Sequence, residues 1–131
     1  PWLTQKWTRE ICKRAYHNGV NGLVGNEDVG QMSAWYVLSV IGLHQACPGD
    51  LRYEITSPVF DEIEIQLDNK NAKSGTFKIV TENNSENNIY IQSAKLNGEV
   101  LDKCFINYND IISGGILEIE MGPSPNKNWG V

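Results

Sequence analysis

The sequence has few basic residues and few cysteines, and each shortage excludes a class of protein. Its 131 residues include 11 Lys and Arg against 16 Asp and Glu, for a net charge of -5. A general nucleic-acid binder needs a basic surface, and no Lys/Arg run occurs, so we expect no nucleic-acid partner. Three scattered cysteines, Cys12, Cys47 and Cys104, exclude a disulfide framework or a zinc site, and we expect three buried free thiols.

Long hydrophobic runs are also absent. The one long uncharged stretch, residues 29–49, contains several polar side chains, and its helical part is too short to span a bilayer. We therefore expect no membrane span in this segment. The chain begins Pro-Trp-Leu-Thr, without an initiator Met or a signal-peptide pattern. We expect it to be the C-terminal part of a longer polypeptide.

Helical periodicity is present only in the first third of the chain. Leu3, Trp7, Ile11 and Ala15 recur every four residues and predict a helix over residues 3–17 with one apolar stripe. Residues 29–43 predict a second helix, whose apolar side chains fall all round its circumference. Such a helix must be buried on every side. We therefore expect its remaining neighbours to lie outside this chain.

After residue 50 the period changes to two, which predicts strands. Alternating segments occur at residues 52–56, 62–67, 76–80, 89–92, 95–96, 100–106 and 116–121, with turn residues between them, including 68–71 and 97–98. This spacing is typical of an antiparallel β-sandwich. The predicted fold class is α+β, with two N-terminal helices in residues 1–49 and a sandwich-like β region in residues 50–131.

A glycine loop before the second helix concentrates the polar chemistry. Gly25, Asn26, Glu27, Asp28 and Gly30 place two adjacent carboxylates and an amide at a helix start. An ionised carboxylate there could act as a general base on water. The same oxygens also suit Ca²⁺, which takes six to eight oxygen ligands. The structural alternative is plain helix capping by Asn26 or Asp28.

Other residues that could carry chemistry have simpler interpretations. His17 and His44 have no partner at metal-ligand spacing, so we expect each to fill a satisfied structural role. Trp35 and Tyr36 could stack on a sugar ring, although core packing is the favoured interpretation for both.

The glycine loop also carries a family resemblance. The run GLVGNEDVGQMSAWYVLS, residues 22–39, resembles the C-terminal signature of glycoside hydrolase family 92. The similarity continues in order through residues 41–43, 48–49, 53–60, 90–98, 114–115, 121–122 and 129–130. These enzymes are calcium-dependent, exo-acting α-mannosidases, often described as α-1,2-mannosidases. The family fold has an N-terminal β-sandwich, an (α/α)₆ barrel and a C-terminal β region. The resemblance implies that this chain supplies the last barrel helices and the β region.

The resemblance also implies roles for the loop. Asp28 would be the general base of an inverting hydrolysis, and Glu27 a supporting carboxylate beside it. Gly25, Asn26 and Gly30 would complete the site loop, where some family members carry Asp in place of Asn26. Asn26, Glu27 and Asp28 are candidates for direct or water-mediated contact with Ca²⁺. The general acid, a Glu, would lie upstream, so the isolated chain is expected to be inactive.

The resemblance implies terminal α-mannosides of N-glycans or mannans as substrates, upstream domains of the same polypeptide as partners, and export from a bacterial cell to the periplasm or beyond. Two other hypotheses come from the residues themselves. Residues 50–131 have the size and strand pattern of a non-catalytic carbohydrate-binding or structural module. Alternatively, the chain is an interaction domain whose glycine loop only caps a helix.

Overall fold

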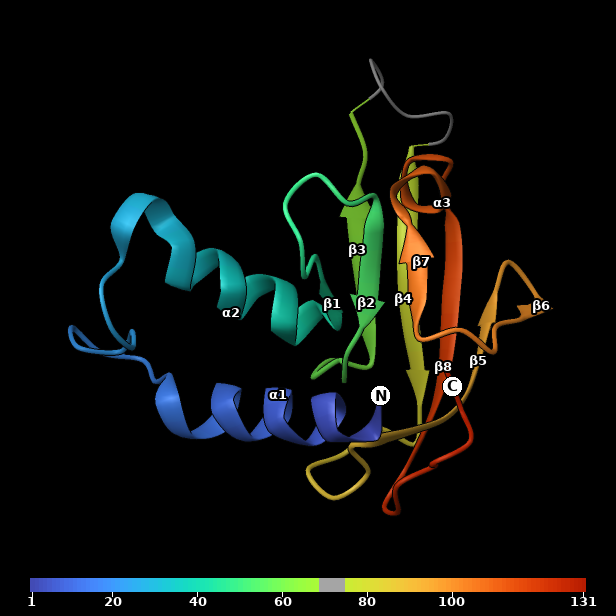
Figure 1. Ribbon diagram of the computed structural model, residues 1–131, viewed down its shortest axis with the longest axis horizontal. Helices are drawn as coiled ribbons and strands as arrows, with labels where there is room; N and C mark the ends of the chain where they lie inside the picture. The colour runs from blue at the N-terminus through green and yellow to red at the C-terminus, as the bar shows by residue number, and fades with distance from the viewer. Residues whose placement is uncertain (69–74) are drawn as a thin grey trace.

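A computed structural model describes residues 1–68 and 75–131 of the chain. Two helices, α1 (Trp2–Ala15) and α2 (Gln31–Ile41), lie beside a group of strands (Figure 1). A short 3₁₀ turn, η1 (Asp28–Gly30), precedes α2, and a third helix, α3 (Tyr108–Ile112), follows later. The strands are β1 (Leu43–His44), β2 (Arg52–Ile55), β3 (Glu62–Gln66), β4 (Thr76–Glu82), β5 (Tyr90–Leu96), β6 (Glu99–Val100), β7 (Phe105–Asn107) and β8 (Gly115–Gly122).

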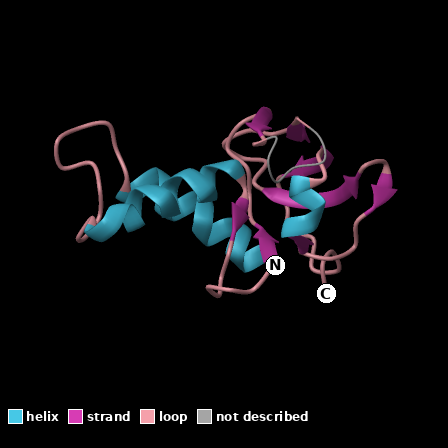
Figure 2. Cartoon of the chain, turned by 90° about the horizontal axis from the view of Figure 1, so that it is seen from above, coloured by secondary structure: helices cyan, strands magenta, loops and turns pink. Residues whose placement is uncertain are grey.

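The two predicted helices form a hairpin that projects from the sheets. Seen from above, they extend to one side, and the loop that joins them lies at their far end (Figure 2). Both are shorter than predicted: α1 stops because Tyr16 adopts an extended conformation, with φ -120°. At the other end of α2, Gly42 has φ 92° and donates its N–H to the carbonyls of Leu38 and Ser39. A Cβ on Gly42 would meet Pro58 Cγ at 2.4 Å, so only glycine fits there.

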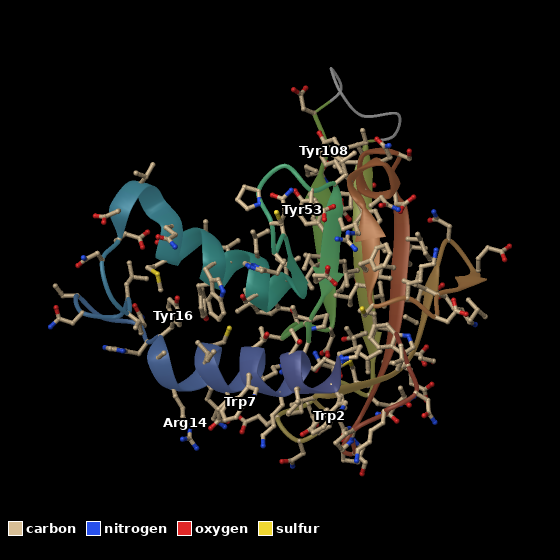
Figure 3. All side chains as sticks on the ribbon, viewed as in Figure 1. Trp2, Trp7, Arg14, Tyr16, Tyr53 and Tyr108 are labelled. Atoms are coloured by element: carbon tan, nitrogen blue, oxygen red, sulfur yellow. The ribbon has the colours of Figure 1, made fainter. Side chains whose placement is uncertain are left out.

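The apolar stripe of α1 is largely exposed. The side chains of Leu3, Trp7 and Ile11 are 50%, 53% and 40% exposed. Figure 3 shows Trp7 directed away from α2. The buried residues of α1 are instead Gln5, Thr8 and Cys12. The stripe is therefore covered only in part by the described residues: Ile11 lines a cavity beside α2, while about half of Leu3 and Trp7 stays exposed.

The second helix is likewise only partly covered. Ser39 and Val40 are its buried residues. Tyr36 and Val37 are 37% and 51% exposed, although α2 carries no charged residue. This agrees with the expectation that a helix apolar on all sides finds too few neighbours within this chain.

The strands form two sheets. One has the order β1-β2-β7, and the other has the order β3-β4-β8-β5-β6. Neighbours are antiparallel except β4 and β8, which run parallel. The prediction of an entirely antiparallel region is wrong at this pair, because alternation identifies the buried face of a strand but not the direction of its partner. The sandwich-like packing and the barrel end remain predictions, and so does the boundary after residue 49.

One hydrophobic cluster draws on both sheets. Phe77 and Ile79 of β4 and Leu117 of β8 are fully buried, and Ile55 of β2 joins them. Trp129, near the chain end, packs on the cluster, and its indole N–H donates to the Leu101 carbonyl at 2.9 Å. The alternation in residues 76–80 and 116–121 is thus confirmed. The turn predicted at residues 68–71 lies mostly outside the described residues.

Several smaller predictions need correction. Of the three thiols, only Cys12 is buried, while Cys47 is exposed and Cys104 half-buried; all three are free. Cys47 is exposed because residues 46–49 form a surface loop between β1 and β2. Two short elements, β1 and α3, were not predicted, since two- and five-residue segments carry too little periodicity. Within the described ranges, no helix is long and apolar enough to cross a membrane.

Candidate functional site

The loop between the two helices carries the predicted site residues to the tip of the hairpin. Residues 16–30 connect the end of α1 to the start of α2, at the end farthest from the sheets (Figures 1 and 2). Glu27 is half-buried, whereas Asn26 and Asp28 are exposed. The β region therefore supports the hairpin at its base and takes no part in the loop itself.

The residue that caps α2 is Glu27, whereas Asn26 or Asp28 was predicted. Both of its carboxylate oxygens accept the backbone N–H of Ser33, at 3.1 Å for Oε1 and 3.0 Å for Oε2. Ser33 belongs to the first turn of α2, whose N–H groups have no partner inside the helix. Neither Asn26 nor Asp28 makes a side-chain cap. The predicted capping role of those two residues is wrong.

A left-handed turn explains this unusual spacing. An ordinary cap precedes its N–H partner by two or three residues, but Glu27 precedes Ser33 by six. Val29 and Gly30 both adopt the left-handed conformation, with φ 59° and 78°. This turn folds the chain back, so that Glu27 reaches the helix start. For Val29 the conformation is strained, because its branched Cβ is crowded there.

The turn leaves the Asp28 carboxylate free. Asp28 starts η1, its side chain is exposed, and its carboxylate accepts no hydrogen bond from any residue of the described ranges. The positive end of a helix favours an anion nearby. An ionised, unpaired carboxylate is what activation of a water molecule requires. The geometry therefore suits Asp28 to a role as general base.

Tyr16 supports the same first turn of α2 from the other side. Its hydroxyl donates to the Met32 carbonyl at 3.5 Å, and its ring stacks on Trp35 at 5.7 Å between centroids. Burial raises the pKa of the Tyr16 hydroxyl, and the negative charges of Cys12 and Glu27 raise it further. Figure 3 shows Tyr16 between the two helices. This contact could not be predicted from the sequence, because Tyr16 lies just beyond the periodic stripe of α1.

A cavity of about 680 Å³ lies beside this aromatic group. Trp35, Met32 and Leu38 line it from α2, and Tyr16 and Ile11 line it from the side of α1. Neither Glu27 nor Asp28 belongs to its lining. The half-buried Trp35 and the 37% exposed Tyr36 meet the expectation of core packing only in part.

His44 does not have the satisfied structural role predicted for it. Its Nδ1 is buried and has no hydrogen-bond partner in the described structure, and the same holds for Thr56 Oγ1. Both residues line a second cavity, of about 440 Å³, at the base of the hairpin. The His44 ring lies edge-on to the Trp35 ring, with 6.4 Å between the ring centroids. For His17, none of the described residues hydrogen-bonds the imidazole, so its predicted satisfied role finds no support.

The described residues do not form a complete metal site. Nowhere in residues 1–68 and 75–131 do three His, Cys, Asp or Glu side chains lie close enough together to hold a metal ion. The loop offers the carboxylate of Asp28 and the amide of Asn26, while Glu27 is bound to the backbone. Calcium takes six to eight oxygen ligands. The residues present do not fit a calcium ion on their own.

Comparison with known proteins identifies relatives of the whole chain. Residues 1–123 match the glycosyl hydrolase family 92 catalytic domain. An inverting mannosidase of this family from Bacteroides thetaiotaomicron superposes with a TM-score of 0.88 and 34% identity over 99% of this chain. A family α-mannosidase from the same organism gives a TM-score of 0.90 and 36% identity over 100% of this chain. An "uncharacterized secreted glycosidase" from Arthroderma benhamiae is 29% identical over 99% of the chain.

These relatives are much longer than this chain. The chain spans 16% of the Arthroderma protein and 17% of each Bacteroides mannosidase. The matched stretch nevertheless includes both helices, the capped loop and both sheets. The chain belongs to glycoside hydrolase family 92, and its residues correspond to part of that family's catalytic domain.

Proposed function

We propose that this chain is the C-terminal part of an exo-acting, inverting α-mannosidase, and that its loop carries the general base. The observation that carries the proposal is the free carboxylate of Asp28, held at a helix start in a chain that matches a catalytic domain. The similarity to two mannosidases supports the substrate class. The match to a catalytic domain also disfavours the alternative of a non-catalytic carbohydrate-binding or structural module.

In the proposed reaction, Asp28 accepts a proton from a water molecule, which attacks the anomeric carbon of the terminal mannose. A general acid on the opposite face protonates the departing glycosidic oxygen, and the product has inverted configuration. This acid is proposed to lie upstream of the present residues. Asp28 can serve this role because no other described residue competes for its oxygens.

Calcium dependence is a proposal for the whole enzyme. The residues of this chain do not form the site, so most ligands would come from elsewhere in the polypeptide. Asn26 and Asp28 are the candidates here for direct or water-mediated contact. When bound, calcium would polarise and orient oxygen ligands as a Lewis acid.

We further propose terminal α-mannosides of N-glycans or mannans as substrates, with α-1,2 linkages first among them. Export from the cell is proposed as well, supported by the description of the Arthroderma relative as secreted. The isolated chain is proposed to be inactive. The exposed apolar stripe of α1 and the exposed Tyr36 and Val37 of α2 are surfaces that upstream domains would cover.

The experiment is mannose release from α-linked mannobiosides by the full-length gene product, with and without a calcium chelator. The anomer first formed is read by NMR. Release of β-mannose that the chelator abolishes would support activity, inversion and calcium dependence together. Absence of release from every linkage, by folded and calcium-loaded protein, would contradict the mannosidase proposal.

A further inference from the structure

We propose that Glu27 is a positioning residue: its carboxylate caps α2, closes the strained turn that contains Asp28, and thereby sets where the Asp28 carboxylate lies. This inference rests on the proposed function of Asp28. It gives Glu27 one role among the three open to a carboxylate in this loop, which are proton transfer, metal binding and helix capping.

Both oxygens of the Glu27 carboxylate are used in hydrogen bonding. Both of its oxygens lie within 3.1 Å of the Ser33 nitrogen. A hydrogen bond from a backbone N–H to an ionised carboxylate is about twice as strong as a neutral one. Asp28, the next residue, has no such partner in the described structure. Two adjacent carboxylates of the same loop are therefore in opposite situations, one bound to the backbone and one free.

Asp28 lies between the two ends of this contact. The bond from Glu27 to Ser33 closes a ring of seven residues, and Asp28, Val29 and Gly30 lie inside it. The backbone carbonyl of Glu27 accepts the N–H of Gly30 at 3.4 Å, which tightens the turn. Left-handed Val29 is strained, and such a conformation persists only where its surroundings hold it. The hydrogen bond from Ser33 to the Glu27 carboxylate is the contact that closes this ring and holds Val29 in place.

Tyr16 supports the same helical turn by a separate hydrogen bond. Tyr16 donates to the carbonyl of Met32, the residue before Ser33. The peptide group between Met32 and Ser33 is thus held at its N–H by Glu27 and at its carbonyl by Tyr16. Loss of the Glu27 contact leaves the helix anchored but releases residues 27–30. A displacement of about 1 Å at a catalytic group can cost about 10²-fold in rate.

The test compares two variants of the full-length enzyme, Glu27→Gln and Glu27→Ala. Glutamine keeps an acceptor oxygen for Ser33 but loses the charge, while alanine loses both. For a positioning cap we expect Glu27→Gln to keep kcat within about threefold of the wild type. We expect Glu27→Ala to lower kcat by about 10- to 100-fold, with KM changed less than about twofold.

A role in proton transfer or metal binding gives a different result. In either case Glu27→Gln would lose as much activity as Glu27→Ala, and that outcome would overturn the proposal. Calcium titrated alone into each variant, followed by calorimetry, provides a readout independent of activity. We expect unchanged calcium affinity in Glu27→Gln, and a loss of about tenfold or more would show that Glu27 acts on the metal, directly or through a ligand, and would overturn the proposal.

Two further variants separate this inference from the proposed function. Glu99→Ala removes an exposed glutamate of β6, far from the loop, and should leave kcat unchanged. Asp28→Asn tests the base itself. An inactive Asp28→Asn beside a fully active Glu27→Ala would reject the positioning role and leave the mannosidase proposal intact. An active Asp28→Asn would reject the proposed base, whatever Glu27 does. If Glu27→Ala does not fold, the comparison of Glu27→Gln with the wild type decides.

Discussion

At the scale of single residues, the two adjacent carboxylates of the loop, Glu27 and Asp28, are in different situations. Glu27 gives both oxygens to the N–H of Ser33, and Asp28 keeps its carboxylate exposed. Between them and the helix, Val29 and Gly30 make the left-handed turn. The Glu27 cap forms only if residues 29 and 30 adopt this left-handed backbone, because only then does the chain fold back toward Ser33.

The strain at Val29 gives a residue-scale prediction. Its side chain is fully exposed and loses no packing when replaced, while its φ of 59° disfavours a branched residue. Asparagine tolerates this conformation far better than valine. We expect Val29→Asn to increase the free energy of unfolding by about 1 kcal/mol. The full-length variant should melt at a higher temperature than the wild type, and a lower melting temperature would show that upstream residues pack on Val29.

The identity of the loop residues was predictable from sequence, but their division of labour was not. Two carboxylates after a glycine at a helix start are visible as a pattern. Which of them caps the helix depends on the left-handed conformation of Val29, and valine gives no sign of it because it rarely adopts such angles. Whether Asp28 acts as the base stays a prediction.

At the scale of elements, a guanidinium joins the helical hairpin to the β region. Arg9 of α1 donates from Nε to Ser57 Oγ at 2.9 Å, and from Nη2 to the Pro58 carbonyl and to Asn84 Oδ1. Burial lowers the pKa of Arg9, although these partners keep its charge satisfied. The planar fork of arginine suits three acceptors at once, which lysine cannot reproduce.

We therefore expect Arg9→Ala to destabilise the protein by about 2–3 kcal/mol, because three acceptors lose a charged donor. Arg9→Lys should recover less than half of this loss. Arg14→Ala is the matched control: the Arg14 side chain is 79% exposed and, among the described residues, pairs only with Glu10, so its removal should cost less than about 0.5 kcal/mol. Melting temperatures of the full-length variants give the comparison, and equal effects of Arg9→Ala and Arg14→Ala would contradict it.

The contact between α1 and α2 gives a pH dependence. Burial raises the pKa of Cys12 above its ordinary value of 9.0 and that of Tyr16 above 10.0. A raised folded-state pKa stabilises the folded protein below the unfolded-state value and loses that contribution as pH rises through the folded-state value. Stability should therefore fall as pH rises from about 9. In thermal unfolding between pH 7 and 11, Tyr16→Phe should show a shallower fall than the wild type, and an identical slope would exclude Tyr16 as a cause.

Sequence periodicity predicted the elements better than their surroundings. The helix of α1 was predictable from the four-residue spacing of Leu3, Trp7 and Ile11, yet these residues lie on its exposed face. An apolar stripe indicates where a partner belongs, but it does not say that the partner is in the same chain. The parallel pairing of β4 with β8 was hidden for a similar reason, since pairing depends on the path of the chain between strands.

At the scale of the whole molecule, the chain has one well-packed region and one sparsely packed one. The cluster around Phe77 and Leu117 is fully buried, whereas the hairpin exposes Trp7, Tyr36 and Val37. The family matched is a catalytic domain, and its members are several times longer, since this chain spans 16–17% of the relatives compared. The exposed helix faces and the free carboxylate both belong to the sparsely packed region.

This asymmetry predicts how the chain behaves alone. We expect the isolated 131 residues to release no mannose from α-mannobiosides, because the proposed general acid lies upstream. We also expect the isolated chain to bind a hydrophobic fluorescent dye more strongly, per molecule, than the full-length protein, because the helix faces are uncovered. Sustained turnover by the isolated chain would contradict the proposal that the general acid lies upstream of these residues.

The central claim is that Asp28 acts as the general base, and its most direct test is Asp28→Asn in the full-length enzyme. The exchange preserves the size of the side chain and leaves the Glu27 cap in place. The account predicts an unchanged melting temperature and a loss of kcat of about 10²-fold or more. Near-normal release of mannose by a folded Asp28→Asn enzyme would contradict it.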